Sequence, residues 1–162
     1  MNATTSDLPA TETEDRLAIL ELTSRLALLV DARDWDALEQ LFTDPVYWDR
    51  TSLFGGEPET QSPAELVGGL RYSLGGLDAT HHMITCLEIS LDGDQATGAA
   101  NMQGTHVLAN PSGDPVWTVG ARHDYRFKRT AGGWRIAAVT FTLQWATGNM
   151  NILTLAAARV QS

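Results

Sequence analysis

Hydrophobic residues recur at helical spacing in the first half of the chain and at strand-like spacing in the second half. A helix is predicted from Thr11, which fits a capping box with Glu14, to about Val30. Its buried face is formed by Ile19, Leu22, Leu26 and Leu29. A short second helix, capped by Asp34, is expected to end at Asp44-Pro45. Its buried face is formed by Leu38, Leu41 and Phe42.

The next part of the chain contains a short predicted strand at 46–48 and a loop at 55–58. Ser62-Pro63-Ala64-Glu65 predicts the start of a third helix, which ends near Gly75-Gly76. Four strand-like segments bounded by turn residues follow, at 79–91, 95–109, 115–129 and 133–147. A short helix is expected at 152–159. Helices followed by an antiparallel meander predict an α+β fold, with a single domain at 11–162 after a disordered tail at 1–10.

One of the predicted strands can be oriented by its side-chain pattern. In 121–128 the charged residues alternate with apolar ones, which directs His123 and Tyr125 inward. The last strand is apolar on both alternating faces, so its outer face needs a cover. We therefore expect a homodimer or homotrimer assembled through the outer face of this C-terminal strand.

Composition narrows the classes of function. The chain has 162 residues and a net charge of −9, which argues against binding to nucleic acid or to an anionic membrane surface. It has no run long enough to span a bilayer and no signal-peptide pattern, so a cytoplasmic location is expected. The single cysteine, Cys86, excludes an internal disulfide, and its apolar surroundings in sequence predict a core position.

The chain lacks the phosphate-binding, dinucleotide, serine-hydrolase and HExxH motifs, so no cofactor is expected and no ligand spacing indicates a metal site. Acid–base chemistry by Asp, His and Tyr remains, and histidine suits proton transfer near neutral pH. The four histidines are His81, His82, His106 and His123. For each of them a purely structural role is the commoner interpretation, and periodicity does not decide whether His81 or His82 points inward.

Three stretches of the chain resemble the SnoaL-like branch of the nuclear transport factor 2-like superfamily. They are residues 30–44, with the sequence VDARDWDALEQLFTD, residues 80–87, and residues 120–136. The resemblance implies a strongly curved sheet wrapped into a cone, with helices closing its wide side and a pocket between sheet and helices. The superfamily hosts many reactions, so its fold does not identify the substrate.

The resemblance also implies roles for individual residues. In scytalone dehydratase and lindane dehydrochlorinase an aspartate at the end of the first helix orients a histidine base, and Asp31 and His82 match these two. Many members have a tyrosine where this chain has His123 and a carboxylate or amide where it has Tyr125, so the far wall of the pocket is unusual. Arg129 lies near the region of the dehydrochlorinase's leaving-group arginine, but an exposed strand-end arginine is the preferred interpretation.

These observations predict a cofactor-independent lyase or isomerase acting on a small, largely apolar, natural-product or polyketide-like molecule. Asp31, His82 and His123 are its expected catalytic residues. The expected substrate pocket is lined by Tyr47, Trp48, Tyr72, Met102 and Tyr125. Two alternatives stay open: a non-catalytic ligand-binding or assembly subunit, like the small subunit of ring-hydroxylating dioxygenases, and an enzyme of the epoxide-hydrolase type.

Overall fold

The computed structural model describes residues 10–111 and 113–161. Its helices are α1 (Ala10–Ala32), α2 (Trp35–Glu39), α3 (Thr51–Phe54), α4 (Pro63–Leu74) and α5 (Ile152–Val160). Its strands are β1 (Phe42–Asp49), β2 (Glu59–Gln61), β3 (Ala79–Asp92), β4 (Gln95–Val107), β5 (Val116–Thr130) and β6 (Gly133–Gly148). The predicted tail at 1–10 falls almost wholly outside the described residues, and Ala10 already belongs to α1.

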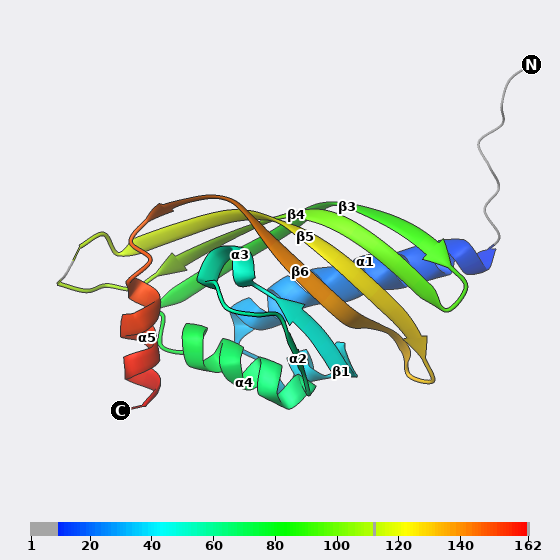
Figure 1. Ribbon diagram of the computed structural model, residues 1–162, viewed down its shortest axis with the longest axis horizontal. Helices are drawn as coiled ribbons and strands as arrows, with labels where there is room; N and C mark the ends of the chain where they lie inside the picture. Colours follow the sequence, from blue (N-terminus) through cyan, green and yellow to red (C-terminus); the bar gives the residue numbers. More distant parts are fainter. Residues whose placement is uncertain (1–9, 112, 162) are drawn as a thin grey trace, which may run out of the picture.

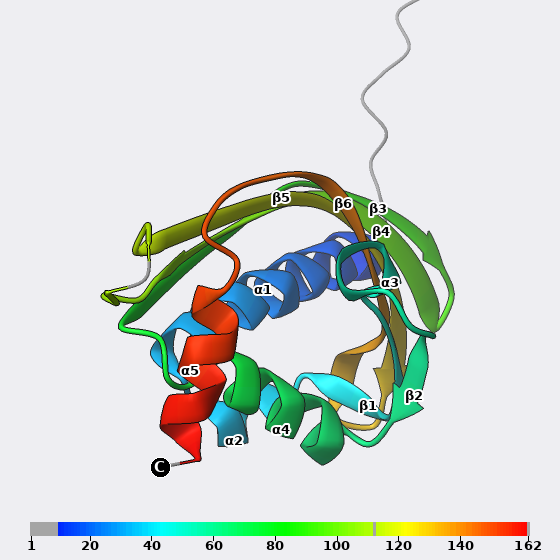
Figure 2. The ribbon, with the colours of Figure 1, turned by 60° about the vertical axis from the view of Figure 1, so that its left-hand side comes forward.

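The strands form one mixed sheet in the order β2-β1-β6-β5-β4-β3. The pair β1–β6 is parallel, whereas the other neighbours are antiparallel. The sheet arches over α1, and α4 and α5 close the opposite side (Figures 1 and 2). The predicted α+β cone is thus confirmed, and the buried side chains of helices and sheet meet inside the arch. Among the described residues, no helix is long and apolar enough to cross a membrane.

The signals for the starts of α2 and α4 are confirmed, whereas α1 begins at Ala10, before the predicted cap Thr11, and the region after α2 differs from the prediction. Ser62 and Glu65 form the predicted capping box of α4, and the Asp34 carboxylate accepts a hydrogen bond from Ala37 N at 3.1 Å. Asp44-Pro45 does not end a helix, because it lies inside β1, where the pairing with β6 is irregular and tolerates proline. Phe42 is therefore a strand residue. The short α3 and β2, on either side of the predicted loop at 55–58, were not predicted.

Bulges change the outer face of the last strand. The alternation predicted for β5 is confirmed, with His123 and Tyr125 buried. Pairing between β5 and β6 shifts at two places, so Ile136, Val139 and Phe141 are all buried despite their uneven spacing. The outer face of β6 is consequently less apolar than strict alternation predicts. The homo-oligomer stays a prediction.

A third bulge corrects the prediction for Cys86. This residue is exposed rather than in the core, and its φ is 57° where the β3–β4 pairing shifts between Thr85 and Glu88. The extra residue moves Cys86 out of the alternation. As a result, the half-buried positions are even-numbered before the bulge, as at His82, and odd-numbered after it.

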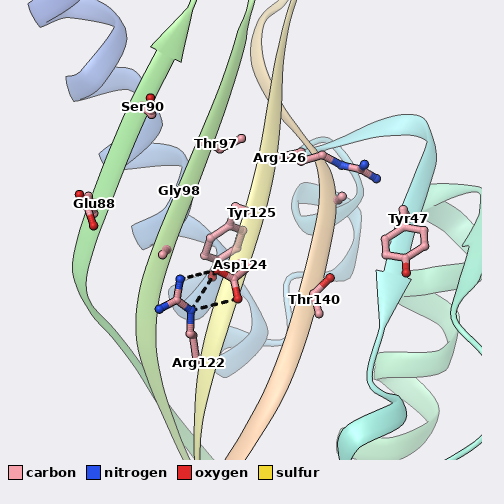
Figure 3. Close-up of a pocket in the computed structure, with 12 residues that line it drawn as sticks. Tyr47, Glu88, Ser90, Thr97, Gly98, Arg122, Asp124, Tyr125, Arg126 and Thr140 are labelled. Atoms are coloured by element: carbon pink, nitrogen blue, oxygen red, sulfur yellow. Dashed lines mark hydrogen bonds and ion pairs between the residues drawn. The ribbon is translucent and has the colours of Figure 1, made fainter.

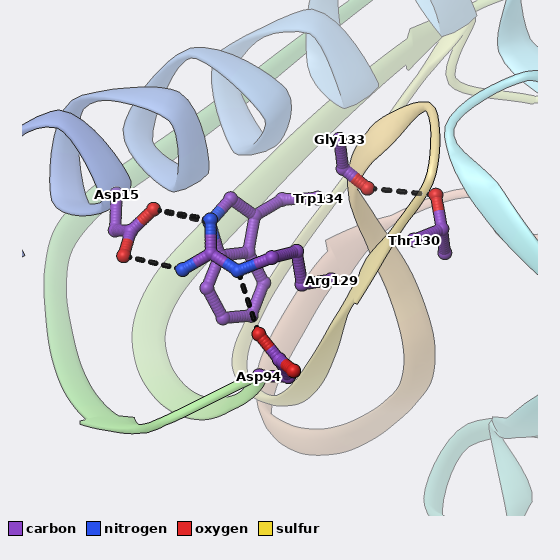
Figure 4. Close-up of polar contacts among 6 residues, drawn as sticks. All are labelled: Asp15, Asp94, Arg129, Thr130, Gly133 and Trp134. Carbon is purple, nitrogen blue, oxygen red and sulfur yellow. Dashed lines mark hydrogen bonds and ion pairs between the residues drawn. The ribbon is translucent and has the colours of Figure 1, made fainter. Parts of the chain in front are cut away.

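Arg129 belongs to a polar cluster that joins the start of α1 to the β3–β4 and β5–β6 hairpins (Figure 4). Its guanidinium donates to the Asp15 carboxylate at 2.7 Å and to Asp94 at 2.9 Å, and it lies over the Trp134 ring. The Trp134 indole N–H also donates to Asp15, at 2.9 Å. Arg129 is therefore a structural residue at the strand end, not a residue of the cavity described below.

Candidate active site

Asp31 and His82 form a hydrogen-bonded pair between the last turn of α1 and β3. Asp31 Oδ1 lies 2.7 Å from His82 Nδ1, and Oδ2 accepts the His82 backbone N–H at 2.8 Å. The Thr80 hydroxyl donates to Oδ1 at 2.8 Å. His81, the preceding residue on β3, is exposed, so the structure directs His82 and not His81 to the inside. The carboxylate is thus held at both oxygens.

The environment of Asp31 determines which nitrogen of His82 carries a proton. Burial by itself raises the pKa of Asp31, but the hydrogen bonds from the His82 ring, the His82 backbone and Thr80 outweigh it and lower the pKa. An ionised carboxylate only accepts hydrogen bonds, so Nδ1 of His82 must donate. The other ring nitrogen, Nε2, has no hydrogen-bond partner in the described part of the chain and is free to accept a proton.

His82 lies in the wall of a cavity of about 120 Å³ between the sheet and the helices. Its lining is largely apolar. Helix residues Leu26, Val30 and Leu70 face strand residues Ile84, Met102 and Phe141 across it. Asp31 does not line the cavity but lies behind His82. This arrangement leaves the histidine as the member of the pair that can touch a ligand.

His123, a second predicted site residue, lines the same cavity from β5. Its Nδ1 lies 2.7 Å from the Tyr125 hydroxyl. Burial, and then the charge of His82, lower the pKa of His123 to about 4, so the ring is neutral at pH 7. Burial raises the pKa of Tyr125, which stays protonated. Because this hydroxyl has no other acceptor among the described residues, the satisfied arrangement has Tyr125 donating to Nδ1, which leaves a proton on Nε2 of His123.

His106 is a cavity residue that was not assigned to the site from sequence. Its ring lies edge-on to His82, with centroids 5.2 Å apart, and stacks at a tilt on Trp117 at 4.9 Å. Burial, and then the charge of His82, lower its pKa to about 4. A signal was present, because His106 shares its alternation with the buried Ala100 and Met102 of the same strand.

Arg50 is a second residue that sequence reasoning missed. It lines the cavity from the end of β1, together with Trp48, and its side chain is half-buried. Arg50 directly follows the last residue of β1 and lies two positions after Trp48, so the alternation that directs Trp48 inward also predicts an inward Arg50.

The other predicted pocket residues have different outcomes. Trp48 and Met102 line the cavity, as predicted. Tyr125 lies behind His123 rather than at the cavity wall. Tyr72 is 47% exposed on α4 and does not line the cavity. Tyr47 points to the opposite face of the sheet, since it neighbours the inward Trp48 on a strand.

Tyr47 borders a larger and more polar groove of about 650 Å³ on the outer face of the sheet (Figure 3). The charged groups there are partly neutralised by each other, since Arg122 donates to both oxygens of Asp124. The Arg126 guanidinium lies 5.4 Å from the centroid of the Tyr47 ring. No histidine lines this groove. It is therefore a weaker candidate for acid–base chemistry than the smaller inner cavity.

Within 10–111 and 113–161, no three His, Cys, Asp or Glu side chains lie close enough together to hold a metal ion.

Comparison with known proteins agrees with this architecture. Rv2910c of Mycobacterium tuberculosis strain H37Rv, an uncharacterised protein, is 30% identical over 131 residues, which are 81% of this chain and 86% of that protein. The crystal structure of Kfla4162 from Kribbella flavida is 32% identical with a TM-score of 0.82, over 90% of this chain and 98% of its own.

A more distant structure is the hexachlorocyclohexane dehydrochlorinase LinA-type3 from Novosphingobium barchaimii LL02. It is 18% identical with a TM-score of 0.69, over 86% of this chain and 92% of its own, a likeness that shows the fold alone. The SnoaL-like domain family matches residues 11–140. This match covers more than half of the chain. The chain therefore belongs to the SnoaL-like domain family, and it has the nuclear transport factor 2-like fold.

Proposed function

We propose that this protein is a cofactor-independent acid–base enzyme, a lyase or isomerase, in which His82 is the base. The observation that carries the proposal is the Asp31–His82 pair, at 2.7 Å, in the wall of a largely apolar cavity. An ionised partner at Nδ1 leaves Nε2 as a base that faces away from the carboxylate. Small, largely apolar molecules, including natural-product or polyketide-like intermediates, suit the lining.

The proposed first step is transfer of a proton from an activated carbon of the substrate to Nε2 of His82. The electron pair left on carbon then forms a double bond, either by expelling a leaving group, as a lyase does, or by shifting into a conjugated carbonyl, as an isomerase does. The imidazolium of His82 is stabilised by Asp31, and it can return the proton to the leaving group or to another carbon.

His123, on β5 of the same sheet, supplies the second hydrogen-bond donor that such a reaction needs. The Nε2–H tautomer fixed by Tyr125 can donate to a carbonyl or leaving oxygen as negative charge develops there. A neutral donor also avoids a second positive charge beside the imidazolium. His106 is also neutral, because burial, and then the charge of His82, lower its pKa. Only one of the three rings is then charged during the reaction.

The names of structural neighbours support the reaction class only in part. A dehydrochlorinase catalyses an elimination, and LinA-type3 shares the fold, but its identity of 18% does not transfer a substrate to this chain. An epoxide-hydrolase type of reaction has less support, because none of the described residues that line the inner cavity is a carboxylate that could activate water. A purely ligand-binding role would leave the free Nε2 of His82 without a use.

The proposal is tested by exchange of substrate hydrogen for deuterium, which reports proton abstraction before any product is known. A panel of small compounds with acidic carbon positions is incubated in heavy water and followed by proton NMR. The wild-type protein is expected to exchange or convert at least one compound, and His82→Gln to lose this activity by about a thousandfold. His81→Gln, at the exposed neighbouring position, is the matched control and should keep it. Equal rates for His82→Gln and wild type would reject the proposal.

A further inference from the structure

Arg50 occupies an unusual position for an arginine, in the wall of a largely apolar cavity. It follows β1 directly and precedes α3, and its side chain points inward beside that of Trp48. The guanidinium carbon lies 5.3 Å from the centroid of the Phe54 ring and 6.0 Å from that of Trp48. Two aromatic rings therefore hold the cation at the cavity instead of a carboxylate.

The contacts of the other half-buried arginines show how unusual this is. Arg16, Arg33 and Arg135 each donate to a backbone carbonyl, and Arg129 pairs with two aspartates. Arg50 has no hydrogen bond to an oxygen in the described part of the chain, and no carboxylate there lies within 4.0 Å of it. A cation that is partly removed from water without a counter-ion is unfavourable, and a bound anion would remove this penalty.

The nearest influence of a carboxylate on Arg50 comes from Glu59. Burial lowers the pKa of Arg50, and the charge of Glu59 opposes this effect. Glu59 is exposed and does not line the inner cavity, but with Glu57 it borders a neighbouring hollow of about 160 Å³ that Arg50 and Trp48 also line. It therefore neutralises Arg50 only at a distance and leaves the cavity side of the guanidinium without an anionic partner.

A second donor beside Arg50 also lacks a partner. Trp48 is 9% exposed, and its indole Nε1 has no hydrogen-bond partner among the described residues. Buried indole N–H groups in proteins are usually satisfied, so this one marks a place where an acceptor is missing. Trp48 and Arg50 thus present one neutral and one charged donor on the same face of the chain.

The other residues that line the cavity indicate the sign of the charge that a ligand should carry. Among the described residues that line the cavity, Arg50 is the only Lys, Arg, Asp or Glu, and the histidines His106 and His123 are neutral at pH 7. The cavity therefore has positive potential at the Arg50 end and an apolar body. Its volume of about 120 Å³ is below the range typical of drug-sized ligands.

We propose that the natural substrate is a small apolar carboxylic acid whose carboxylate is bound by Arg50, with the Trp48 indole N–H as a second donor. This inference rests on the proposed function, because it gives the substrate an orientation: the carboxylate at Arg50 and the acidic carbon toward His82. Guanidinium groups recognise carboxylates through charge and paired donors, which a neutral amide matches poorly.

Binding can be tested without turnover, using benzoate and benzamide as matched probes that differ in charge. Dissociation constants are measured by NMR titration of the whole protein at pH 7. Wild type is expected to bind benzoate at least about tenfold more tightly than benzamide. Arg50→Gln should lose this preference and keep its benzamide affinity within about twofold, while Arg50→Lys should keep part of the preference.

Glu59→Gln provides the control for a role of Arg50 in pairing with that residue. Removal of a nearby negative charge should leave benzoate binding equal or tighter. Equal affinity of wild type for the two probes would overturn the inference, and so would an Arg50→Gln variant that weakens both probes alike. The two proposals fail separately: if His82→Gln keeps hydrogen exchange while the charge preference depends on Arg50, the acid–base proposal fails and the carboxylate site stands.

Discussion

Replacing Asp31 by asparagine is predicted to move a proton on His82, because the amide offers one acceptor where the carboxylate offers two. Its oxygen is expected to face the His82 backbone N–H, which has no alternative acceptor in the described chain. The amide NH₂ group then faces Nδ1 and the Thr80 hydroxyl. Nδ1 must accept, so the proton of the neutral ring moves to Nε2, and the nitrogen that faces the substrate is no longer basic.

The size of the effect on stability follows from the three hydrogen bonds to Asp31. Hydrogen bonds to a charged group contribute about 1.5–3 kcal/mol and neutral ones about 0.5–1.5 kcal/mol, so three conversions lower the free energy of unfolding by about 3 kcal/mol. Burial of the carboxylate is itself unfavourable, which reduces the expected loss to about 2 kcal/mol. Activity on an identified substrate should fall about 10³- to 10⁴-fold, the scale known for amidation of the triad aspartate in serine proteases.

Urea unfolding at pH 7 and nitrogen-15 NMR of the histidine side chains measure these two effects. Asp34→Asn is the matched control. Asparagine caps a helix about as well as aspartate, and Asp34 caps α2 and does not line the cavity. The pKa of Asp31 is lowered in the folded protein, so its contribution is present above the unfolded value of about 3.9 and is lost as the pH falls below it. A variant within about 0.5 kcal/mol of wild type, with Nδ1 of His82 still protonated, would refute this reasoning.

Three further predictions concern the pH dependence, the cavity wall and the hairpin contact. His106 and His123 have pKa values of about 4, so the unfolded chain, with values near 6.5, binds protons that the folded state excludes. The free energy of unfolding should therefore fall from pH 6.5 to pH 4 by up to about 1.4 kcal/mol per pH unit for each histidine. His106→Gln should make this pH dependence less steep when the free energy is measured by urea unfolding. An unchanged pH dependence in His106→Gln would contradict the prediction. Gly104→Ala places a Cβ 3.0 Å from the His106 ring and 3.1 Å from the His82 ring, which must displace one of these rings. Turnover should therefore fall, with little loss of helical and sheet signal in circular dichroism. Turnover at the wild-type rate would contradict this prediction. Arg129→Gln should lower the melting temperature but leave turnover intact, since its partners Asp15, in α1, and Asp94, in the β3–β4 turn, do not line the cavity. Lost turnover in a folded variant would assign it a role in the site.

The parts of the fold that sequence predicts well are those with strong local signals. The Ser62 capping box and the hairpin turns gave the helix start and the strands within a few residues. Strict alternation failed where bulges intervene, at Cys86 and along β6, since a bulge changes the face of every later residue and leaves no clear mark in the sequence. The segment around Asp44-Pro45 was misread because a proline that ends a helix and one inside an irregular strand look alike.

The site residues also differ in how far local sequence signals predict them. Asp31 and His82 are 51 positions apart, and only the resemblance to a family, not periodicity, brought them together before the fold was known. Tyr72 and Tyr47 were included because tyrosine suits the chemistry, although strand and helix faces place them elsewhere. Arg50 was missed for the opposite reason: a lone arginine in sequence resembles a surface residue, and its missing counter-ion is visible only when every neighbour is placed.

The central claim is that Nε2 of His82 removes a proton from the substrate, and hydrogen–deuterium exchange tests it most directly. Exchange of a compound turned over by wild type should fall about a thousandfold in His82→Gln and stay within about twofold of wild type in His81→Gln. If His82→Gln, shown to be folded by its amide NMR spectrum, exchanges substrate hydrogen within a few-fold of the wild-type rate, His82 is not the base.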